Sequence, residues 1–137
     1  MKRIILISCS SKKLNGKAKA SEIYSSPLFK LGLRYAYSLS PDKIFILSAK
    51  YDLLRLDDEI EPYNLTLNTM NDEERKIWSE KVLEKLKKEV DLEKDEILFL
   101  AGKNYRKYLA PQIRNYKVPM EGLGIGKQLK FLKEKLK

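Results

Sequence analysis

The 137-residue sequence predicts an α/β fold: a three-layer α/β/α sandwich with a central, mainly parallel sheet of four strands, built as a single domain over residues 1–137. Three observations lead to this prediction. Four short apolar runs lack the alternation of half-buried strands and are typical of strands covered on both faces. Helical patterns lie between them, and repeated strand–helix alternation favours parallel strands joined by right-handed crossovers. No internal repeat, low-complexity tract or Pro/Gly/Ser-rich linker divides the chain, so one domain is expected.

The expected strands are runs rich in Ile, Leu, Val and Phe. Each is short enough for a strand, and each is followed by polar residues or by a turn signal. The last run has the weakest apolar signal. In chain order the four are Arg3–Ser8, Lys43–Ser48, Glu96–Ala101 and Tyr116–Pro119.

Capping signals mark the first two expected helices. Ser26 followed by Pro27 is typical of an N-cap with proline at the first helical position, and this helix is expected to end near Leu39. Asn71 with Glu74 three residues later resembles a capping box that opens a second helix. Along the second helix one apolar stripe recurs every four residues: Trp78, Val82, Leu86 and Val90. Two further helices are expected over Arg106–Ile113 and from about Gly124 onward.

The stretch from Lys50 to Met70 interrupts this alternation, and the sequence predicts no regular structure in it. Irregular stretches of this length are uncommon inside compact domains and often carry function. The alternative is a packed surface loop held by apolar residues such as Leu53, Leu54 and Leu65. Both interpretations stay open at this point.

Charge and composition limit the functional classes. The chain has 28 Lys and Arg against 19 Asp and Glu, a net charge of +9, which favours a polyanionic partner such as nucleic acid. Lys- and Glu-rich thermophilic proteins are also basic without any specific partner. No apolar stretch approaches the roughly 20 residues that cross a bilayer, so no membrane contact is expected. The single cysteine cannot form an internal disulfide, which favours a cytoplasmic location.

The chain contains no histidine. A Ser-His-Asp or Cys-His catalytic site is therefore excluded within it, and so are the common zinc sites. We expect no metal and no cofactor. Acid–base catalysis would fall to Asp, Glu, Lys, Tyr or Cys side chains.

Polar and cationic residues follow every expected strand. Because parallel strands place their carboxyl ends at one edge, where ligands of open α/β sheets bind, we expect these residues to line one site. Lysine charge and backbone N–H groups of Ser and Gly turns suit phosphate. Lysine is abundant throughout, so coincidence is the alternative. The candidate phosphate- or ligand-binding residues are Ser8, Ser10, Ser11, Lys12, Lys13, Ser48, Lys50, Tyr51, Gly102, Lys103, Tyr105, Gly124, Gly126 and Lys127.

Cys9 and Glu121 are the candidate catalytic residues. Three interpretations of Cys9 stay open: a buried small hydrophobe, a thiolate nucleophile stabilised by Lys12 and Lys13, and a thiol that lines a pocket. Glu121 follows the last strand and precedes a glycine turn, which is a suitable position for an acid or base. The other candidate proton carriers are Glu61, Asp52 and Tyr63, although such carboxylates are usually solvated surface groups.

The segment "GLGIGK" near the C-terminus is rich in glycine but matches neither known nucleotide fingerprint. Glu121 stands where a Walker P-loop has its first glycine, and Gln128 replaces the Ser or Thr after the lysine. The G-x-G-x-G spacing also differs from the G-x-G-x-x-G dinucleotide motif. Glycines at the entry to a helix allow close approach of either a ligand or a neighbouring helix, and both alternatives remain.

Six segments together resemble a family of small bacterial and archaeal proteins of unknown function. They span nearly the whole chain in order: "SCSSKKL", "EIYSSPLFKLGLRYA", "ILSAKYDLL", "EPYNLTLNTM", "AGKNYRKYL" and "VPMEGLGIGKQLKFL". The opening "ILISCSSKKL" is distantly similar to that of the YaaA peroxide-stress family, which is associated with DNA binding. Its Cys9, Ser10 and Lys13 also resemble a motif of the archaeosine synthase core domain, which modifies a deazaguanine base in transfer RNA. These likenesses imply a uracil-DNA glycosylase-like fold.

Two main hypotheses for function follow, and a third, an enzyme of a phosphate-bearing metabolite unrelated to nucleic acid, stays open because α/β folds serve many functions. The first is a nucleotide- or nucleic-acid-binding domain that acts as an enzyme of nucleobase modification or glycosidic-bond chemistry. In this hypothesis a base stacks on Tyr51 or Tyr105. The phosphate binds to Lys12, Lys13, Lys103 and Lys127. The motif's flanking residues differ here, and the histidines of glycosylase motifs are absent, so lysine transfer and uracil excision are not expected. The alternative is a non-catalytic DNA- or RNA-binding stress-response protein that acts through its basic surface.

Overall fold

A five-stranded sheet forms the centre of the molecule in the computed structural model, which describes all residues 1–137. The strand order is β4-β3-β1-β6-β7. Four strands are parallel, and β4 pairs antiparallel with β3 at one edge. The mainly parallel sheet of an α/β protein is therefore confirmed, with one strand more than predicted. The strands are β1 (Arg3–Ser8), β3 (Lys43–Ser48), β4 (Asp52–Arg55), β6 (Glu96–Leu100) and β7 (Tyr116–Lys117).

The additional strand β4 lies within Lys50–Met70, so the prediction of an irregular stretch there is wrong. The chain reverses directly after β3, and Asp52 takes a positive φ of 66°, a conformation that Asp adopts more readily than most residues. The stretch also contributes β5 (Glu59–Ile60), which pairs with β2 (Ala18–Lys19), and the short 3₁₀ helix η1 (Leu67–Thr69). Strands of two to four residues carry too few positions for their periodicity to be read.

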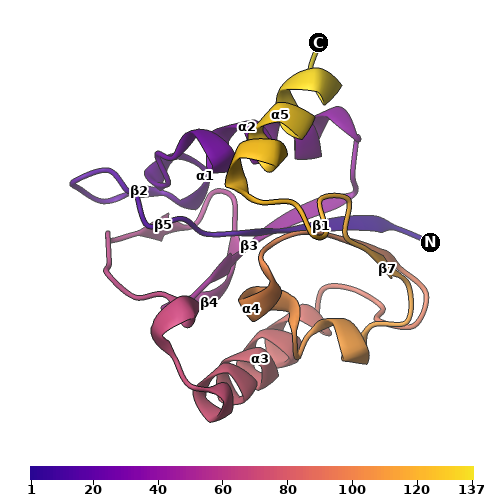
Figure 1. Ribbon diagram of the computed structural model, residues 1–137. Helices are drawn as coiled ribbons and strands as arrows, with labels where there is room; N and C mark the ends of the chain where they lie inside the picture. The colour runs from indigo at the N-terminus through magenta and orange to yellow at the C-terminus, as the bar shows by residue number, and fades with distance from the viewer.

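Helices cover both faces of the sheet, as Figure 1 shows. One face carries α1 (Ala20–Ile23), α2 (Pro27–Ser38) and α5 (Ile125–Lys135). The other carries α3 (Asp72–Leu86) and α4 (Lys103–Arg106). The predicted helix over Arg106–Ile113 is wrong: α4 ends at Arg106, and only the 3₁₀ turn η2 (Ala110–Gln112) follows. Pro111 lacks the N–H that a continuing helix would need. No helix is long and apolar enough to cross a membrane.

The apolar runs pack against both helical layers, which explains why they do not alternate. Along β1, Ile4 and Leu6 lie in the cluster beneath α3, whereas Ile5 and Ile7 lie in the cluster beneath α2 and α5. All four side chains are buried. Complete burial of one such side chain stabilises the fold by roughly 1.5–3 kcal/mol. The central strand therefore joins the two halves of the core.

The two helix starts predicted from capping signals are confirmed. The Ser26 hydroxyl accepts the Phe29 N–H at 3.2 Å at the start of α2. The Asn71 side chain accepts the Glu74 N–H at 2.8 Å, and the Glu74 carboxylate accepts the Asn71 N–H at 3.0 Å, which completes the capping box of α3. These hydrogen bonds satisfy N–H groups that have no partner inside the helix.

The strand order reverses between β1 and β6. The connection that leaves β1 runs through α2 on one face to β3, and the connection that leaves β6 runs through α4 on the other face to β7. The two crossovers therefore diverge at the carboxyl ends of β1 and β6. In open α/β sheets this divergence leaves a crevice where ligands bind.

Candidate functional site

A cavity of about 570 Å³ lies at this reversal point. Its floor and walls come from the ends of β1 and β6, the first turns of α2 and α5, the start of α4 and the segment 64–68. We call it the switch-point cavity. Its lining includes nine of the predicted site residues: Ser8, Cys9, Ser10, Ser11, Lys12, Lys13, Gly102, Lys103 and Tyr105.

The charge of this lining is entirely positive. Lys12, Lys13 and Lys103 line the cavity, and no Asp or Glu does. None of the three lysines forms an ion pair with a carboxylate elsewhere. A concave surface lined by one sign of charge concentrates its field and attracts ions of the opposite sign. The cavity is therefore electrostatically suited to an anion.

The first turn of α2 adds to the positive potential of the cavity. Ser26, Pro27, Leu28 and Phe29 line the cavity. The twelve-residue helix α2 begins there and directs the positive end of its dipole toward the cavity. Its capping residue Ser26 also brings a hydroxyl to the wall. The helix start and the lysines therefore favour the same kind of ligand.

Cys9 lies half-buried in the wall and contacts Tyr105. The Cys9 Sγ atom is 3.4 Å from the Tyr105 hydroxyl oxygen, which also accepts the Leu67 N–H at 3.5 Å. Burial raises the pKa of the Tyr105 hydroxyl, so it stays neutral. Its ring meets Trp78 edge to face at 5.6 Å and is buried. Tyr105 is thus a fixed wall residue, and its ring face is not free to stack a base as we expected.

Lys13 is held differently from the other two lysines. Its Nζ atom lies 4.3 Å from the centre of the Tyr63 ring and 5.8 Å from that of Tyr24, and it donates to the Ser11 carbonyl at 3.2 Å. Partial burial lowers the pKa of the Lys13 ammonium, while a Cys9 thiolate acts in the opposite direction. Lys12 and Lys103, by contrast, are exposed.

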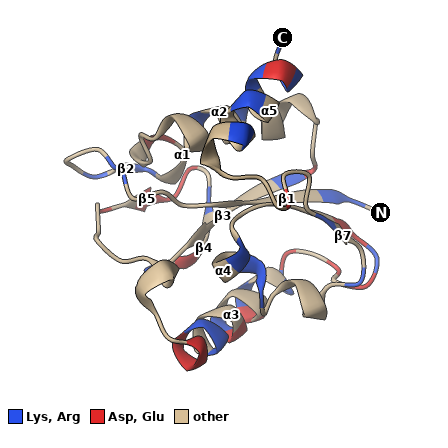
Figure 2. Cartoon of the chain, in the orientation of Figure 1, with Lys and Arg blue, Asp and Glu red and all other residues tan.

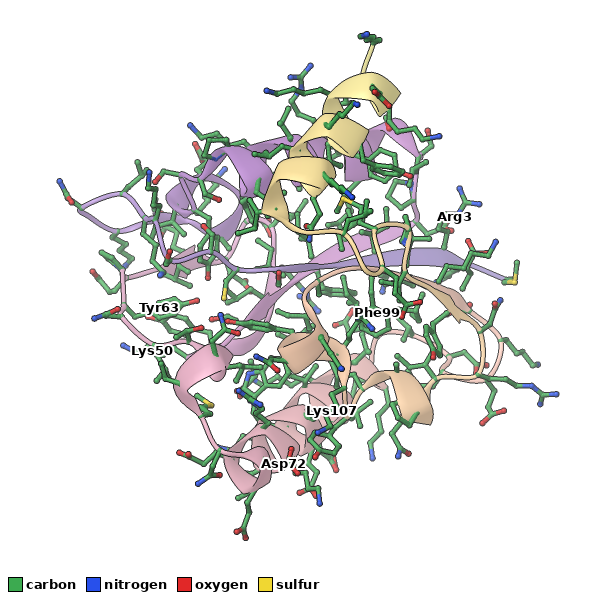
Figure 3. All side chains as sticks on the ribbon, in the orientation of Figure 1. Arg3, Lys50, Tyr63, Asp72, Phe99 and Lys107 are labelled. Atoms are coloured by element: carbon green, nitrogen blue, oxygen red, sulfur yellow. The ribbon has the colours of Figure 1, made fainter.

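A chain of hydroxyls fixes the segment that forms the far wall. The Tyr63 hydroxyl lies 2.7 Å from that of Tyr24 and 2.8 Å from the Ser48 Oγ atom, which accepts the Tyr51 N–H at 3.0 Å. Burial raises the pKa of Tyr24 to about 12 and raises that of Tyr63 further, so neither phenol ionises near neutral pH. Tyr63 lies in the segment that leads to η1, on the same side of the molecule as Lys50 (Figure 3). The chain is structural, because it positions residues 64–68.

Seven predicted site residues do not line the cavity. Ser48 is fully buried in the hydroxyl chain, and Lys50 and Tyr51 lie in the turn between β3 and β4. Glu121 is exposed and pairs with Arg106 at 3.3 Å. Gly124, Gly126 and Lys127 are exposed at the start of α5, whose Ile125, Gln128 and Leu129 line the cavity instead. The other candidate proton carriers also lie outside the lining: Asp52 pairs with Lys85 at 3.4 Å, and the backbone of Glu61 contacts the Tyr51 hydroxyl.

Sequence reasoning missed several polar residues of the lining. They come mainly from the stretch that was expected to be irregular and from the start of α4. The Asn104 Nδ2 donates to the Asn68 Oδ1 at 2.9 Å and so joins these two walls. The local signal was the density of Asn and Thr in residues 64–69, together with Asn104 directly after Lys103. The missed residues are Ser26, Asn64, Thr66, Asn68, Asn104 and Gln128.

A second, shallower depression of about 640 Å³ lies at the opposite edge of the sheet, near the N-terminus. Charges of both signs line it, with Lys2, Lys87 and Lys88 beside Glu89, Asp91 and Asp95. The Asp95 carboxylate accepts the backbone N–H groups of Lys2 and Asp91, both at 2.9 Å. It lies away from the carboxyl ends of the strands, so we regard the switch-point cavity as the functional site. No group of three or more Cys, Asp or Glu residues is arranged to hold a metal ion.

Comparisons with known proteins agree with the resemblance drawn from the sequence. The model of a family of unknown function, DUF6884, matches residues 4–134. The chain is also similar to a UPF0246 protein of Crocosphaera subtropica, with 33% identity over 88 residues, which are 60% of this chain and 35% of that protein. The match thus spans about a third of the relative's length, and it is consistent with the likeness to YaaA. No solved structure matches the chain.

Proposed function

We propose that this chain, which belongs to the DUF6884 family of unknown function, binds a nucleotide in the switch-point cavity. One observation carries the proposal: three lysines line a concave site at the carboxyl ends of parallel strands, and no carboxylate neutralises them. Phosphate would lie near Lys12, Lys13 and Lys103, where the hydroxyl of Ser11 supplies a further donor.

The remaining lining suits the nucleoside part of such a ligand. Apolar side chains from α2 and α5, among them Leu28, Phe29 and Leu129, form one wall. Amide groups of Asn64, Asn68 and Asn104 form the opposite wall and offer donors and acceptors to a base or a ribose. A volume of about 570 Å³ falls within the range of small-molecule sites. A nucleotide, which has a flat base at one end and a charged phosphate at the other, matches a cavity with lysines in one part and apolar and amide walls in another.

The proposed chemistry is nucleobase modification or glycosidic-bond chemistry, and it would use residues other than Glu121. The titratable residues of the lining are Cys9, Lys12, Lys13, Lys103 and Tyr105. Acid or base catalysis in this cavity would therefore involve a thiol, an amine or a phenol. A uracil-DNA glycosylase-like architecture stays part of the proposal, supported by the four parallel strands between two helical layers.

Thermal unfolding with a panel of ligands tests nucleotide binding. Nucleoside monophosphates and triphosphates are compared with the free nucleosides and with ribose phosphate. A ligand present at 100 times its dissociation constant contributes about 2.7 kcal/mol to stability, which raises the melting temperature measurably. We expect stabilisation by nucleotides that Lys12→Ala and Lys103→Ala each weaken, while Lys50→Ala, outside the cavity, leaves it unchanged. If no nucleotide stabilises the protein, the proposal is wrong.

A second candidate function, nucleic-acid binding through a basic surface, has its own supporting observation. Residues 12–38 and 119–137 contain eleven Lys and Arg against three Asp and Glu, a net charge of +8 out of the chain's +9. Within these segments α2 and α5 lie side by side, and the ring centres of Tyr35 and Phe131 are 5.7 Å apart. The basic side chains of the two helices form no ion pairs. Figure 2 shows blue along α5 with red near its C-terminal end, whereas red and blue alternate along α3.

Salt dependence separates the two candidates. Contacts with phosphodiesters release counterions, so affinity for an oligonucleotide should fall steeply with salt concentration. Replacing Lys130 and Lys133 on α5 by Gln should weaken oligonucleotide binding and reduce this slope, and Lys76→Gln with Lys81→Gln on α3 are the matched controls. Equal effects of the two pairs would contradict a specific role for the α2–α5 surface.

A further inference from the structure

We infer that Lys13 is the nucleophilic amine of the switch-point cavity and condenses with the carbonyl carbon of a phosphate-bearing aldehyde or ketone. This inference rests on the proposed function in one respect, since the phosphate site would bring such a ligand to the amine. It goes further because it gives Lys13 a covalent role that Lys12 and Lys103 do not share.

Lys13 lines the cavity, and its amine is held against two tyrosine rings. The backbone of Lys13 forms an antiparallel bridge with Tyr24, and its Nζ atom lies over the rings of both Tyr24 and Tyr63. Lys12 and Lys103 are exposed, and their ammonium groups have no such cover. A nucleophile must be held at a constant position beside its ligand, and Lys13 alone among the three lysines has contacts that do so.

The partners of the amine allow it to lose its proton. No carboxylate lies within ion-pair distance of Lys13, and the facing groups are the Ser11 carbonyl, the Cys9 thiol and the two phenols. Both phenol hydroxyls are occupied in the Tyr24–Tyr63–Ser48 chain and stay neutral. The aromatic faces attract the ammonium, whereas partial burial lowers the pKa of Lys13. Lysines that react with carbonyl groups are activated in this way.

The reaction needs no oxidant, reductant or cofactor. The lone pair of the neutral Nζ attacks the carbonyl carbon and forms a C–N bond, and the carbonyl oxygen takes up a proton that the amine gives up. The carbinolamine then loses its hydroxyl together with the remaining N–H proton as water and becomes an imine, and addition of water regenerates the amine and the carbonyl compound. C1 of a ribose is an aldehyde when the ring is open. A ring-opened ribose phosphate is therefore the ligand class closest to the proposed nucleotide.

Pyridoxal phosphate followed by borohydride tests the inference directly. This probe carries both an aldehyde and a phosphate, and reduction converts its imine into a stable adduct that peptide mapping locates. Near neutral pH we expect Lys13 to be modified faster than Lys12, Lys103 or Lys50, because its amine is held beside the proposed phosphate site. Pyridoxal without phosphate should show weaker selectivity. Modification of Lys13 no faster than that of the exposed lysines would overturn the inference.

Two further measurements keep the result unambiguous. Tyr63→Leu removes the ring over Nζ and should slow the modification of Lys13, measured on variant protein that still melts cooperatively. Tyr63→Phe keeps the ring and should leave the rate within about twofold of that of the unchanged protein. An unchanged rate in Tyr63→Leu would contradict the role of the ring. Adenosine monophosphate serves as competitor: selective modification without protection supports the amine and contradicts nucleotide binding. Nucleotide binding with an unreactive Lys13 contradicts the amine and leaves the proposed function standing.

Discussion

The Sγ atom of Cys9 lies 3.4 Å from the hydroxyl oxygen of Tyr105, so the end of β1 contacts α4 within the wall of the cavity. The thiol is half-buried rather than enclosed. Both apolar clusters contact Cys9, which places it at the junction of the two halves of the core. Of the three interpretations of this residue, a thiol that lines a pocket agrees with this geometry.

Protection of Cys9 from a thiol reagent should report ligand binding. Cys9 is the single cysteine, so the reaction with Ellman's reagent has one source. A nucleotide in the cavity would block access to Sγ, and at 100 times its dissociation constant the rate should fall by about a hundredfold. Inorganic phosphate, which is smaller, should protect less. An unchanged rate at a nucleotide concentration that raises the melting temperature would show that the nucleotide binds elsewhere.

Glu121→Gln should leave ligand affinity unchanged. Its carboxylate lies outside the cavity lining and pairs with Arg106 at the surface. Loss of an exposed ion pair of this kind costs about 0–1 kcal/mol of stability. Calorimetric titration of both proteins with the same nucleotide measures the effect. A tenfold or larger loss of affinity in the variant would return Glu121 to the site.

Ser48→Ala should destabilise the protein by about 1–3 kcal/mol. The fully buried Oγ accepts the Tyr51 N–H and contacts the Tyr63 hydroxyl, and the variant leaves a buried donor without a partner. The Ser48 carbonyl, which accepts the Trp78 Nε1–H at 2.8 Å, is retained. Urea unfolding measures the difference, and Ser10→Ala, at the cavity rim, is the matched control with little expected effect. Equal stability of the two variants would show that the hydroxyl chain does not hold the wall segment.

Asp95→Asn should lower stability at neutral pH and lose this effect in acid. Hydrogen bonds from the Asp91 and Lys2 backbone N–H groups lower the pKa of Asp95 below its usual value. A lowered carboxyl pKa contributes stability above the unfolded pKa, and that contribution disappears as pH falls through the folded pKa. The expected loss near neutral pH is about 1–2 kcal/mol, as for hydrogen bonds to a charged group. Urea unfolding of both proteins across the acidic range should show their stabilities converge, and a constant difference would contradict this origin.

The sequence predicted the parts of the fold that depend on local chemistry. The runs of β1, β3 and β6 are continuous and apolar, and the Ser26 and Asn71 caps are short-range hydrogen bonds, so each could be identified from neighbouring residues. Strand β4 could not, because it depends on pairing with β3 across a turn at Asp52. The helix expected over Arg106–Ile113 failed for a reason visible in the sequence, the proline at position 111.

The site was predictable only where a strand tip leads directly into the cavity. Residues 8–13 and 102–105 follow β1 and β6, the two strands that flank the reversal point, and they gather there. Lys50 and Tyr51 follow β3, which leads into a tight turn to β4 instead. Glu121 and Lys127 follow β7, and their segment reaches the cavity through Ile125 and Gln128. The strand order determines which strand ends reach the cavity, and it could not be predicted from the sequence.

An ion pair between the segment after α4 and the start of α3 depends in the same way on residues that are distant in the sequence. Lys107, just after α4, pairs with Asp72 in the first turn of α3 at 3.2 Å, and Figure 3 shows the two side chains directed toward each other. Tyr108 contacts the same carboxylate. These contacts join residues more than thirty positions apart in the chain. They hold α4, and with it Lys103, beside the opening of the cavity.

The first turn of α5 closes one side of the switch-point cavity, and Leu132 is the one residue of that helix with a fully buried side chain. During synthesis on the ribosome, β1, β3 and β6 emerge well before this helix does. A nascent chain can thus assemble its sheet while the binding site still lacks a wall. If the cavity binds a nucleotide as proposed, binding should be possible only after α5 has emerged, and a nascent chain stalled before α5 should fail to retain the ligand.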